Sequence, residues 1–182
     1  MLFAPAAATA AETRPVELVR TEVAALLAVL DDKTLDAAQR RQALSDRIAK
    51  RFDLMDMAQR ILAVNWAKAT PEQRTEFVTL FRGVLEKKYV DAIAKRTTET
   101  VRVGGERVRG DFATVIVTIE RGQGADIPLL FKLKRTDDGW IAYDANVEGL
   151  SLVQHYRERF GAIAKNKGIK GVLEHLRSGA TS

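Results

Sequence analysis

The order of hydrophobic patterns along the chain predicts an α+β fold, in which helices cradle a twisted antiparallel sheet of about four strands. Apolar residues recur at three- and four-residue spacing up to about residue 95, at every second residue from about 99 to 147, and again at helical spacing from 151 onward. Short turns rich in glycine and aspartate separate the strands, which favours antiparallel pairing. Helices grouped before and after one meander of strands are typical of the α+β class.

Four helices are expected before the sheet. They cover residues 15–30, residues 36–51, a segment capped by Asp53, and residues 71–95. The last of them has the clearest start, because Thr70 can cap it, Pro71 suits its first turn and Gln73 completes a capping box. Ser151 is expected to cap the helix that follows the sheet in the same way.

Glycine-rich turns delimit the strands. We expect a hairpin of residues 99–103 and 106–109 around Gly104-Gly105, strands at 111–120, 127–133 and 140–147, and then helices at 151–167 and 169–177. In the last strand the period of two places Ile141, Tyr143, Ala145 and Val147 on one face. Asp144 is expected on the other face, as a turn or surface residue that accepts hydrogen bonds.

Composition is that of a single domain, which we assign to residues 12–182. The length of 182 residues is enough to bury a substantial core. The chain is 29% charged and has no run of about 18 apolar residues, which excludes an integral membrane protein. It has no cysteine, which excludes disulfides and thiolate catalysis.

The first eleven residues differ in composition from the rest. Residues 1–11 carry no charge and are mostly alanine, and Ala8-Thr9-Ala10 has the small-x-small form of a signal-peptidase site. We interpret this segment as the residual tail of a signal peptide, so that the protein is exported. The alternative is an alanine-rich terminus with no targeting role.

Positive charge is concentrated near the C-terminus. The net charge is +5, and residues 154–177 contain six basic groups against two acidic ones. Such a surface can face anionic headgroups, an acidic protein partner or nucleic acid, and otherwise is a solvated helix face. The residues expected on this partner or membrane surface are Arg157, Arg159, Lys165, Lys167 and Lys170.

Patterns of catalytic or metal-binding residues are missing from the sequence. The glycine pairs lack the strand–glycine–helix context of a phosphate-binding loop. His155 and His175 lie on different expected helices, which predicts no metal site, and Ser151 lacks the surroundings of a nucleophile. The sequence therefore predicts a protein with no catalytic residue and no cofactor.

Several short motifs, taken in their order, resemble one known family. In and after the last strand these are Gly139-Trp140, Tyr143-Asp144 and Glu148-Gly149-Leu150-Ser151. Upstream they are Leu62-Ala63-Val64-Asn65-Trp66, Ala69-Thr70-Pro71, Gln73-Arg74, Phe77, Phe81, Leu85 and Tyr89, and downstream Tyr156-Arg157, Phe160 and Lys167-Gly168-Ile169. Over roughly residues 15–178 this order is similar to the MlaC/toluene-tolerance family of periplasmic phospholipid-binding proteins. Ala63 stands where that family often has glycine, and Leu150 where it usually has valine.

The resemblance implies a soluble periplasmic carrier with an apolar cavity between a twisted sheet and its helices, in the general style of nuclear-transport-factor and cystatin-like folds. Its ligand would be a diacyl phospholipid held by the tails. Its partners would be an inner-membrane ABC transporter with an MCE-domain protein and an outer-membrane lipoprotein–porin complex. Nucleic acid is not among the expected partners.

Once the resemblance implies a cavity, the apolar faces of the expected strands and helices indicate which side chains line it. These are Leu62, Phe81, Leu85, Tyr89, Leu129, Phe131, Leu133, Ile141, Tyr143, Val147 and Leu150. Leu150 is expected at the mouth, where the last strand turns into a helix. We therefore expect Leu150→Glu to leave the protein folded and to remove bound lipid, because a carboxylate is desolvated beside lipid tails.

Three other functions stay open at this point. A hopanoid or another polycyclic lipid is an alternative ligand for a carrier of the same family. An enzyme on a fold resembling ketosteroid isomerase would need a carboxylate and a tyrosine in one pocket, and the sequence shows no such pair. The basic net charge suggests a nucleic-acid binder, but no helix-turn-helix or aromatic RNA-binding motif accompanies it.

Overall fold

Five antiparallel strands and a set of flanking helices form the part of the chain that the computed structural model describes, residues 13–95 and 100–179. The strands lie in the order β1 (Thr100–Arg109), β2 (Phe112–Glu120), β3 (Ile127–Thr136), β4 (Gly139–Val147) and β5 (Leu150–Ser151). The helical segments are α1 (Pro15–Asp31), α2 (Ala37–Ala49), α3 (Leu54–Leu62), α4 (Val64–Lys68), α5 (Pro71–Leu85), the π-helical turn η1 (Glu86–Val90), α6 (Asp91–Ala94) and α7 (Leu152–Arg177). The expected α+β class is confirmed, whereas the expected signal-peptide tail, residues 1–11, lies outside the described residues.

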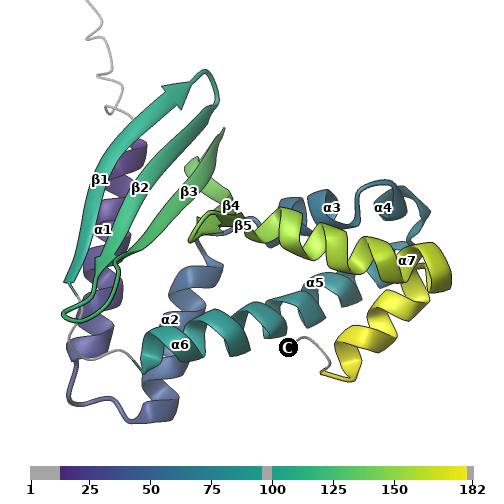
Figure 1. The fold of residues 1–182 in the computed structure, drawn as a ribbon, viewed down its shortest axis with the longest axis horizontal. Helices are drawn as coiled ribbons and strands as arrows, with labels where there is room; N and C mark the ends of the chain where they lie inside the picture. Colours follow the sequence, from purple (N-terminus) through teal and green to yellow (C-terminus); the bar gives the residue numbers. More distant parts are fainter. Residues whose placement is uncertain (1–12, 96–99, 180–182) are drawn as a thin grey trace, which may run out of the picture.

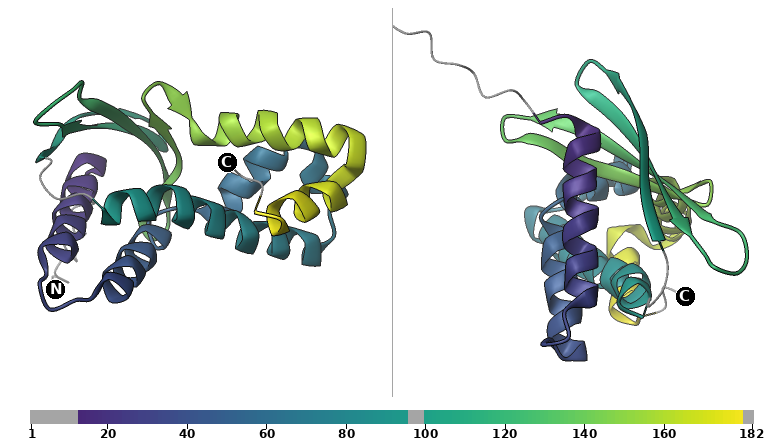
Figure 2. Two further views of the ribbon diagram at one scale, coloured as in Figure 1. Left: turned by 60° about the horizontal axis from the view of Figure 1, so that its bottom comes forward. Right: turned by 90° about the vertical axis from the view of Figure 1, so that its left-hand side faces the viewer.

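The sheet and the main group of helices occupy opposite ends of the molecule. Figure 1 shows β1, β2 and β3 at one end with α1 along them, and α3, α5 and α7 at the other end. In Figure 2 the sheet curves over α1, α2 and the end of the rod that α5, η1 and α6 form. The rod therefore runs from the helical end to the space beneath the sheet.

Side-chain caps fix where two of these helices begin. At the start of α5 the Gln73 backbone N–H donates to the Thr70 hydroxyl at 3.3 Å, and the Thr70 N–H donates to the Gln73 side-chain oxygen at 3.0 Å. At the start of α3 the Asp53 carboxylate accepts from the Asp56 N–H at 2.9 Å. Each bond satisfies a backbone donor that a first helical turn leaves unpaired. The capping box and the Asp53 cap expected from the sequence are confirmed.

Two hydrophobic cores hold the described residues together. The helical core lies between α3, α5 and α7, and its large buried rings are Phe77, Phe81, Tyr156 and Phe160. The sheet core lies between α1 and the inner face of the sheet, and includes Val16, Val19, Val115, Val117 and Trp140. The two cores are separate clusters of buried residues.

The expected hairpin around Gly104-Gly105 is wrong. β1 continues through both glycines and pairs with β2 on either side of them, with a bulge between Val103 and Glu106. The chain reverses instead at Gly110, whose φ of 57° lies in the left-handed region that favours glycine. At the other end of the chain the two expected helices, 151–167 and 169–177, are confirmed as the two arms of α7, which are separated by a break at Gly168 with φ of 63° and ψ of −168°.

Candidate functional site

An apolar cavity of about 380 Å³ lies between the two cores. The inner face of the sheet supplies one wall, which contains Ile119, Ile127, Leu129, Phe131, Ala145 and Val147. The opposite wall comes from α2, α3 and the rod of α5, η1 and α6, while α1 and the start of α7 contribute at its edges. We call this space the main cavity.

Strand register explains the composition of the sheet wall. Leu129 pairs with Val147, and Phe131 pairs with Ala145. Paired residues of neighbouring strands share a face, so these four side chains project together into the main cavity. Leu129, Phe131 and Val147 therefore lie where the sequence placed them, and their contact with lipid stays a prediction.

A β-bulge in β4 changes which residues face inward. Leu133 pairs with Ala142 and Lys132 pairs with Asp144, so that Tyr143 is the extra residue between two paired positions. The alternation of the strand therefore shifts by one residue at Tyr143. The sequence suggests that side chains alternate between the two faces along the whole strand. In the structure this alternation holds before the bulge and again after it, but not across it.

The bulge removes Ile141 and Tyr143 from the expected lining. Ile141 pairs with Lys134, whose side chain projects from the outer face of the sheet. Tyr143 lies beside the Phe112 ring at 5.9 Å and beneath the Arg60 guanidinium at 4.4 Å. The placement of these two residues in the cavity wall is wrong because the sequence carries no mark of the bulge.

The helix wall contains two of the four helical residues that were expected there. Leu85 and Tyr89 line the main cavity, but Leu62 and Phe81 are 2% and 0% exposed within the helical core. All of Phe81, Leu85 and Tyr89 lie on one stripe of the rod. The stripe first packs against α7, where Phe81 meets Tyr156 at 5.0 Å, and then continues beneath the sheet. Leu62 and Phe81 are therefore buried in the helical core and do not line the main cavity, contrary to expectation.

The remaining two expected residues lie outside the main cavity. Leu133 is buried in the sheet core and lines a smaller pocket on the far side of Phe131. Leu150 is 67% exposed, because Glu148 and Gly149, with φ of 51° and 89°, form a two-residue hairpin turn that places it in β5. The expected direct turn from strand to helix is therefore wrong. Leu150 pairs with Val147 and so shares its face, and its place at a cavity mouth stays a prediction.

Several lining residues were not found from the sequence. They include Leu26, Ile48, Phe52, Leu54 and Met57. Four of them lie on apolar helix stripes that the sequence does show, but a stripe does not say whether another side chain or a void lies opposite. Phe52 falls between two helices, where no periodic signal exists.

Ser45 and Arg82 pair with Glu86 at the helical wall of the cavity. The Ser45 hydroxyl donates to the Glu86 carboxylate, and the Arg82 Nε donates to it at 2.8 Å. Burial alone would raise the pKa of Glu86, but these bonds and the Arg82 charge lower it. Burial, together with the neighbouring Tyr156 hydroxyl, raises the pKa of Tyr89 well above its usual range. At neutral pH Glu86 is therefore ionised and Tyr89 is protonated. A ketosteroid-isomerase-like site would instead need a carboxyl group whose pKa is raised.

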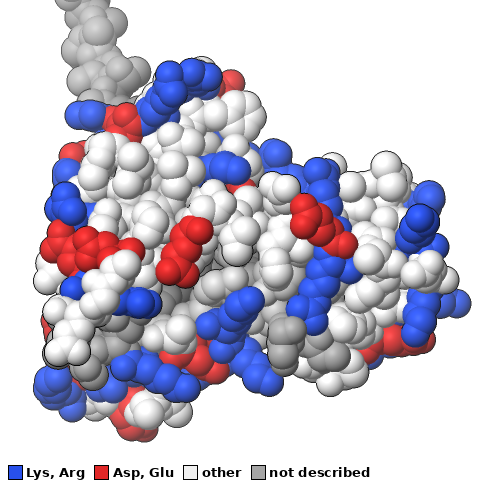
Figure 3. Space-filling view, in the orientation of Figure 1, with Lys and Arg blue, Asp and Glu red and all other residues white. Residues whose placement is uncertain are grey.

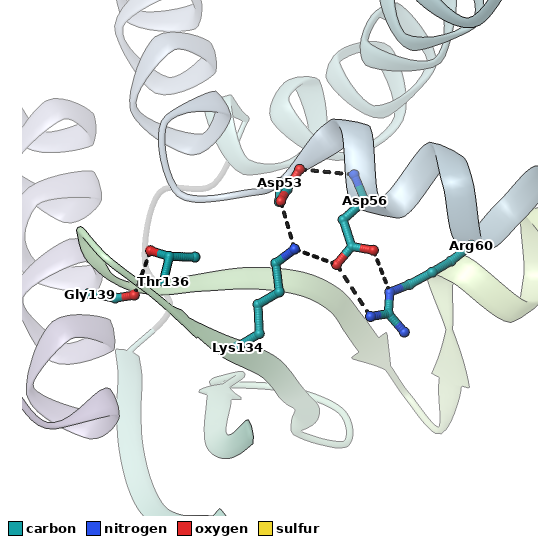
Figure 4. Close-up of polar contacts among 6 residues, drawn as sticks. All are labelled: Asp53, Asp56, Arg60, Lys134, Thr136 and Gly139. Carbon is teal, nitrogen blue, oxygen red and sulfur yellow. Dashed lines mark hydrogen bonds and ion pairs between the residues drawn. The ribbon is translucent and has the colours of Figure 1, made fainter. Parts of the chain in front are cut away.

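Ion pairs join α3 to the sheet beside the cavity (Figure 4). Lys134 Nζ lies 2.9 Å from Asp53 and 2.7 Å from Asp56, and Asp56 also pairs with Arg60 at 2.8 Å. Burial opposes the charge of Asp53, but hydrogen bonds from the Asp56 N–H and Lys134 lower its pKa. Burial likewise opposes the charge of Lys134, but the two carboxylates raise its pKa. We call this group the α3–β3 seam.

Asp144 is a buried residue, 3% exposed, and the expectation of a turn or surface position is wrong. Its carboxylate accepts from Lys132 Nζ at 2.9 Å, from the Ser151 hydroxyl at 2.7 Å and from the Val153 N–H at 3.1 Å. Ser151 in turn accepts from the Gln154 N–H, which confirms its role as a cap. A negative charge at a helix N-terminus is favourable, so Asp144 fixes the start of α7 against the sheet.

Most of the basic residues expected on a partner surface are exposed. Arg157, Lys165, Lys167 and Lys170 are exposed on α7, and Arg159 is half-buried. Figure 3 shows basic side chains over the end of the molecule that α7 covers, with other basic groups elsewhere on the same face. That this surface meets a partner stays a prediction.

Metal-binding and membrane-spanning features are not found in residues 13–95 and 100–179. Within these ranges no group of three or more His, Cys, Asp or Glu side chains is placed to hold a metal ion. Nor does any helix in them combine the length and the hydropathy that crossing a bilayer requires.

A family model described as MlaC protein matches residues 20–178. The chain belongs to the MlaC family. The family resemblance seen in the sequence is thus confirmed. A curated MlaC relative, the intermembrane phospholipid transport system binding protein of Haemophilus influenzae, is 24% identical over 127 residues. The alignment covers 67% of this chain but only 59% of that protein, less than two thirds of its length.

A solved structure of similar fold extends the MlaC comparison to nearly the whole chain. It is the phospholipid-binding protein from Ralstonia solanacearum, determined in complex with a phospholipid. The two folds superpose with a TM-score of 0.80 at 25% sequence identity, covering 92% of this chain and 96% of that one. The arrangement of sheet and helices described above is therefore shared with that protein.

Proposed function

We propose that this MlaC-family protein binds a diacyl phospholipid by its tails in the main cavity and carries it through the periplasm. The observation that supports the proposal most directly is the cavity itself. Its sheet wall is apolar throughout, and its volume of about 380 Å³ lies within the usual range of small-ligand pockets. The phospholipid held by the Ralstonia solanacearum protein supports the same class of ligand.

The physical need for such a carrier follows from the hydrophobic effect. Each methylene exposed to water costs about 0.8 kcal/mol, so two acyl chains of roughly 30 methylenes cost about 24 kcal/mol. A lipid therefore crosses water slowly unless a protein replaces the burial that the bilayer gives. A tail-directed site leaves the headgroup in water, so the proposed carrier tolerates different headgroups.

The proposed cycle has two membrane partners. As the family resemblance implies, they are an outer-membrane lipoprotein–porin complex and an inner-membrane ABC transporter with an MCE-domain protein. The name of the Haemophilus influenzae relative, an intermembrane transport system binding protein, supports transport between two membranes.

Mass analysis of lipid extracted from the purified protein tests the ligand. We expect phospholipid in the wild type, and at least a tenfold loss of it in Leu129→Glu, because a carboxylate beside lipid tails is desolvated at a cost of several kcal/mol. Leu130→Glu is the matched control, since the neighbouring leucine lies on the outer face of the same strand. A hopanoid in the extract would favour a polycyclic ligand, and a wild type without lipid would refute a lipid carrier.

The basic residues of α7 are proposed to steer the carrier toward anionic membrane faces or acidic partner subunits. Steering between exposed charges raises the encounter rate and is screened over about 8–10 Å at physiological ionic strength. We therefore expect lipid transfer between donor and acceptor complexes to slow as salt is added. Charge reversal at Lys165 and Lys167 should flatten this dependence, and transfer that is indifferent to salt would leave these residues as a solvated surface.

A further inference from the structure

A second, smaller pocket adjoins the main cavity. Its volume is about 80 Å³, and α1 and α2 enclose it against the inner face of the sheet. Leu26, Ile48, Phe52 and Phe131 line both this pocket and the main cavity, so these four residues form the wall between the two spaces. We call the smaller space the side pocket.

Two aromatic rings form the centre of that wall. The rings of Phe52 and Phe131 meet edge to face, with their centroids 6.1 Å apart. The backbone around Phe52 is anchored to β4, because the Asp53 N–H donates to the Ala142 carbonyl at 2.8 Å and the Ala142 N–H donates to the Arg51 carbonyl at 2.9 Å. Neither ring is fully buried, since each borders a void on two sides. The wall can therefore open by side-chain rotation without a change of backbone.

Charged side chains line part of the rim of the side pocket. Glu22 pairs with Arg47 at 3.0 Å and with Arg51 at 2.6 Å, and its side chain is only 13% exposed. The three residues lie at the rim of a space whose other walls are apolar, including Val19, Val23 and Leu133. Such a pocket is suited to hydrocarbon, because apolar cavities stay free of water.

We propose that the side pocket is an extension of the lipid site, and that the Phe52–Phe131 pair sets the acyl-chain length that the main cavity accepts. The inference rests on the proposed lipid-carrier function. When the wall is closed, a lipid acyl chain in the main cavity ends at the rings of Phe52 and Phe131. With the wall open, the side pocket adds room for roughly five water-sized groups, about three to five methylenes.

The test uses lipid-free protein loaded from vesicles that contain equal amounts of phosphatidylglycerols with short, medium and long saturated chains. We expect wild type to select against the long chains and Phe52→Ala to accept chains longer by about two to four carbons, because the deleted ring joins the two spaces. Should Phe52→Ala fold poorly, Phe52→Leu removes the ring while keeping most of the packing.

Two further variants separate chain-length selection from a general loosening of the site. Val23 lines the side pocket but not the main cavity, so Val23→Phe in the Phe52→Ala background should restore the wild-type chain length. Phe112→Ala removes a half-exposed ring on the outer face and should change nothing. Lipid-loaded Phe52 variants with unchanged chain lengths, or no rescue by Val23→Phe, would overturn the chain-length role alone. Wild type that takes up no lipid would overturn the carrier function as well.

Discussion

In the helical core, Phe77, Phe81 and Phe160 are fully buried, and their ring centroids lie within 5.6 to 6.4 Å of one another. In the sheet half, Phe52 and Phe131 meet at a similar 6.1 Å but remain partly uncovered, with a void on either side. The side chains are of the same kind, and the difference lies in what surrounds them. Three helices enclose the first group, whereas a curved sheet stands away from the helices opposite the second. Apolar residues thus make a solid core where elements close on them and a binding cavity where they do not.

The largest difference between the two halves is expected in their response to truncation. Phe81→Ala should lower the free energy of unfolding by about 3–5 kcal/mol, because it opens a void in a packed core. Leu129→Ala should cost only about 1 kcal/mol, since part of its surface already faces a cavity. Urea unfolding of lipid-free protein measures both values, because bound lipid would add its own stabilisation. Equal losses would mean that the sheet half is packed as tightly as the helical half.

The α3–β3 seam between the halves should give the next largest effect. Lys134→Met keeps the apolar stem but leaves Asp53 without its partner, and should lower the free energy of unfolding by about 1–2 kcal/mol. Partial exposure of the pair keeps the loss below that of a buried ion pair. Lys87→Met is a control that removes a lysine from an exposed position on the rod, and it should change stability little.

The pH dependence of the seam follows from its pKa shifts. The pKa of Asp53 is lowered in the folded state, so its stabilisation is complete above the ordinary value of 3.8 and is lost as pH falls through the folded value. The pKa of Lys134 is raised, so its stabilisation is complete below 10.5 and is lost as pH rises through the folded value. Wild type and Lys134→Met should therefore differ by a constant amount near neutral pH and converge in acid. A difference that persists unchanged in acid would rule out the ion pair as its source.

A strained residue in the helical half should give a smaller effect of opposite sign. Ala63, between α3 and α4, has φ of 49° and ψ of −120°, a conformation that glycine adopts more easily than any other residue. Ala63→Gly should therefore raise the free energy of unfolding by about 1 kcal/mol, since the left-handed region costs about that much for an L-residue. Ala67→Gly, in the helical turn that follows, is the control and should destabilise.

The sequence predicts most of the helices and strands, and the family, because each depends on local patterns. Thr70 and Gln73 cap α5 as expected, and Leu129, Phe131 and Val147 share a face as expected. Such features follow from residue type and spacing within a few positions. They need no knowledge of what packs opposite.

The wall of the cavity is less predictable for the same reason. Phe81 and Leu85 belong to one helical stripe, but the first lies in the helical core and the second beneath the sheet. The bulge at Tyr143 depends on pairing with β3 and leaves no local mark. Phe52 has no periodic neighbours and yet separates the two cavities. These outcomes depend on how distant elements meet, which a single sequence does not show.

The smallest effect is expected at Leu150, which the sequence placed at the cavity mouth. Its side chain is 67% exposed, and its register partner Val147 lines the main cavity. Leu150→Glu should change the free energy of unfolding by no more than about 0.5 kcal/mol, because its carboxylate reaches water in the lipid-free protein. Leu150 shares the face of Val147, so this variant should lose part of its lipid, whereas Val147→Glu should lose most of it because its carboxylate is desolvated beside the tails. The ratio of lipid to protein after purification measures both variants. If Leu150→Glu keeps the wild-type amount of lipid, the lipid site ends at Val147 and Leu150 does not lie at its mouth.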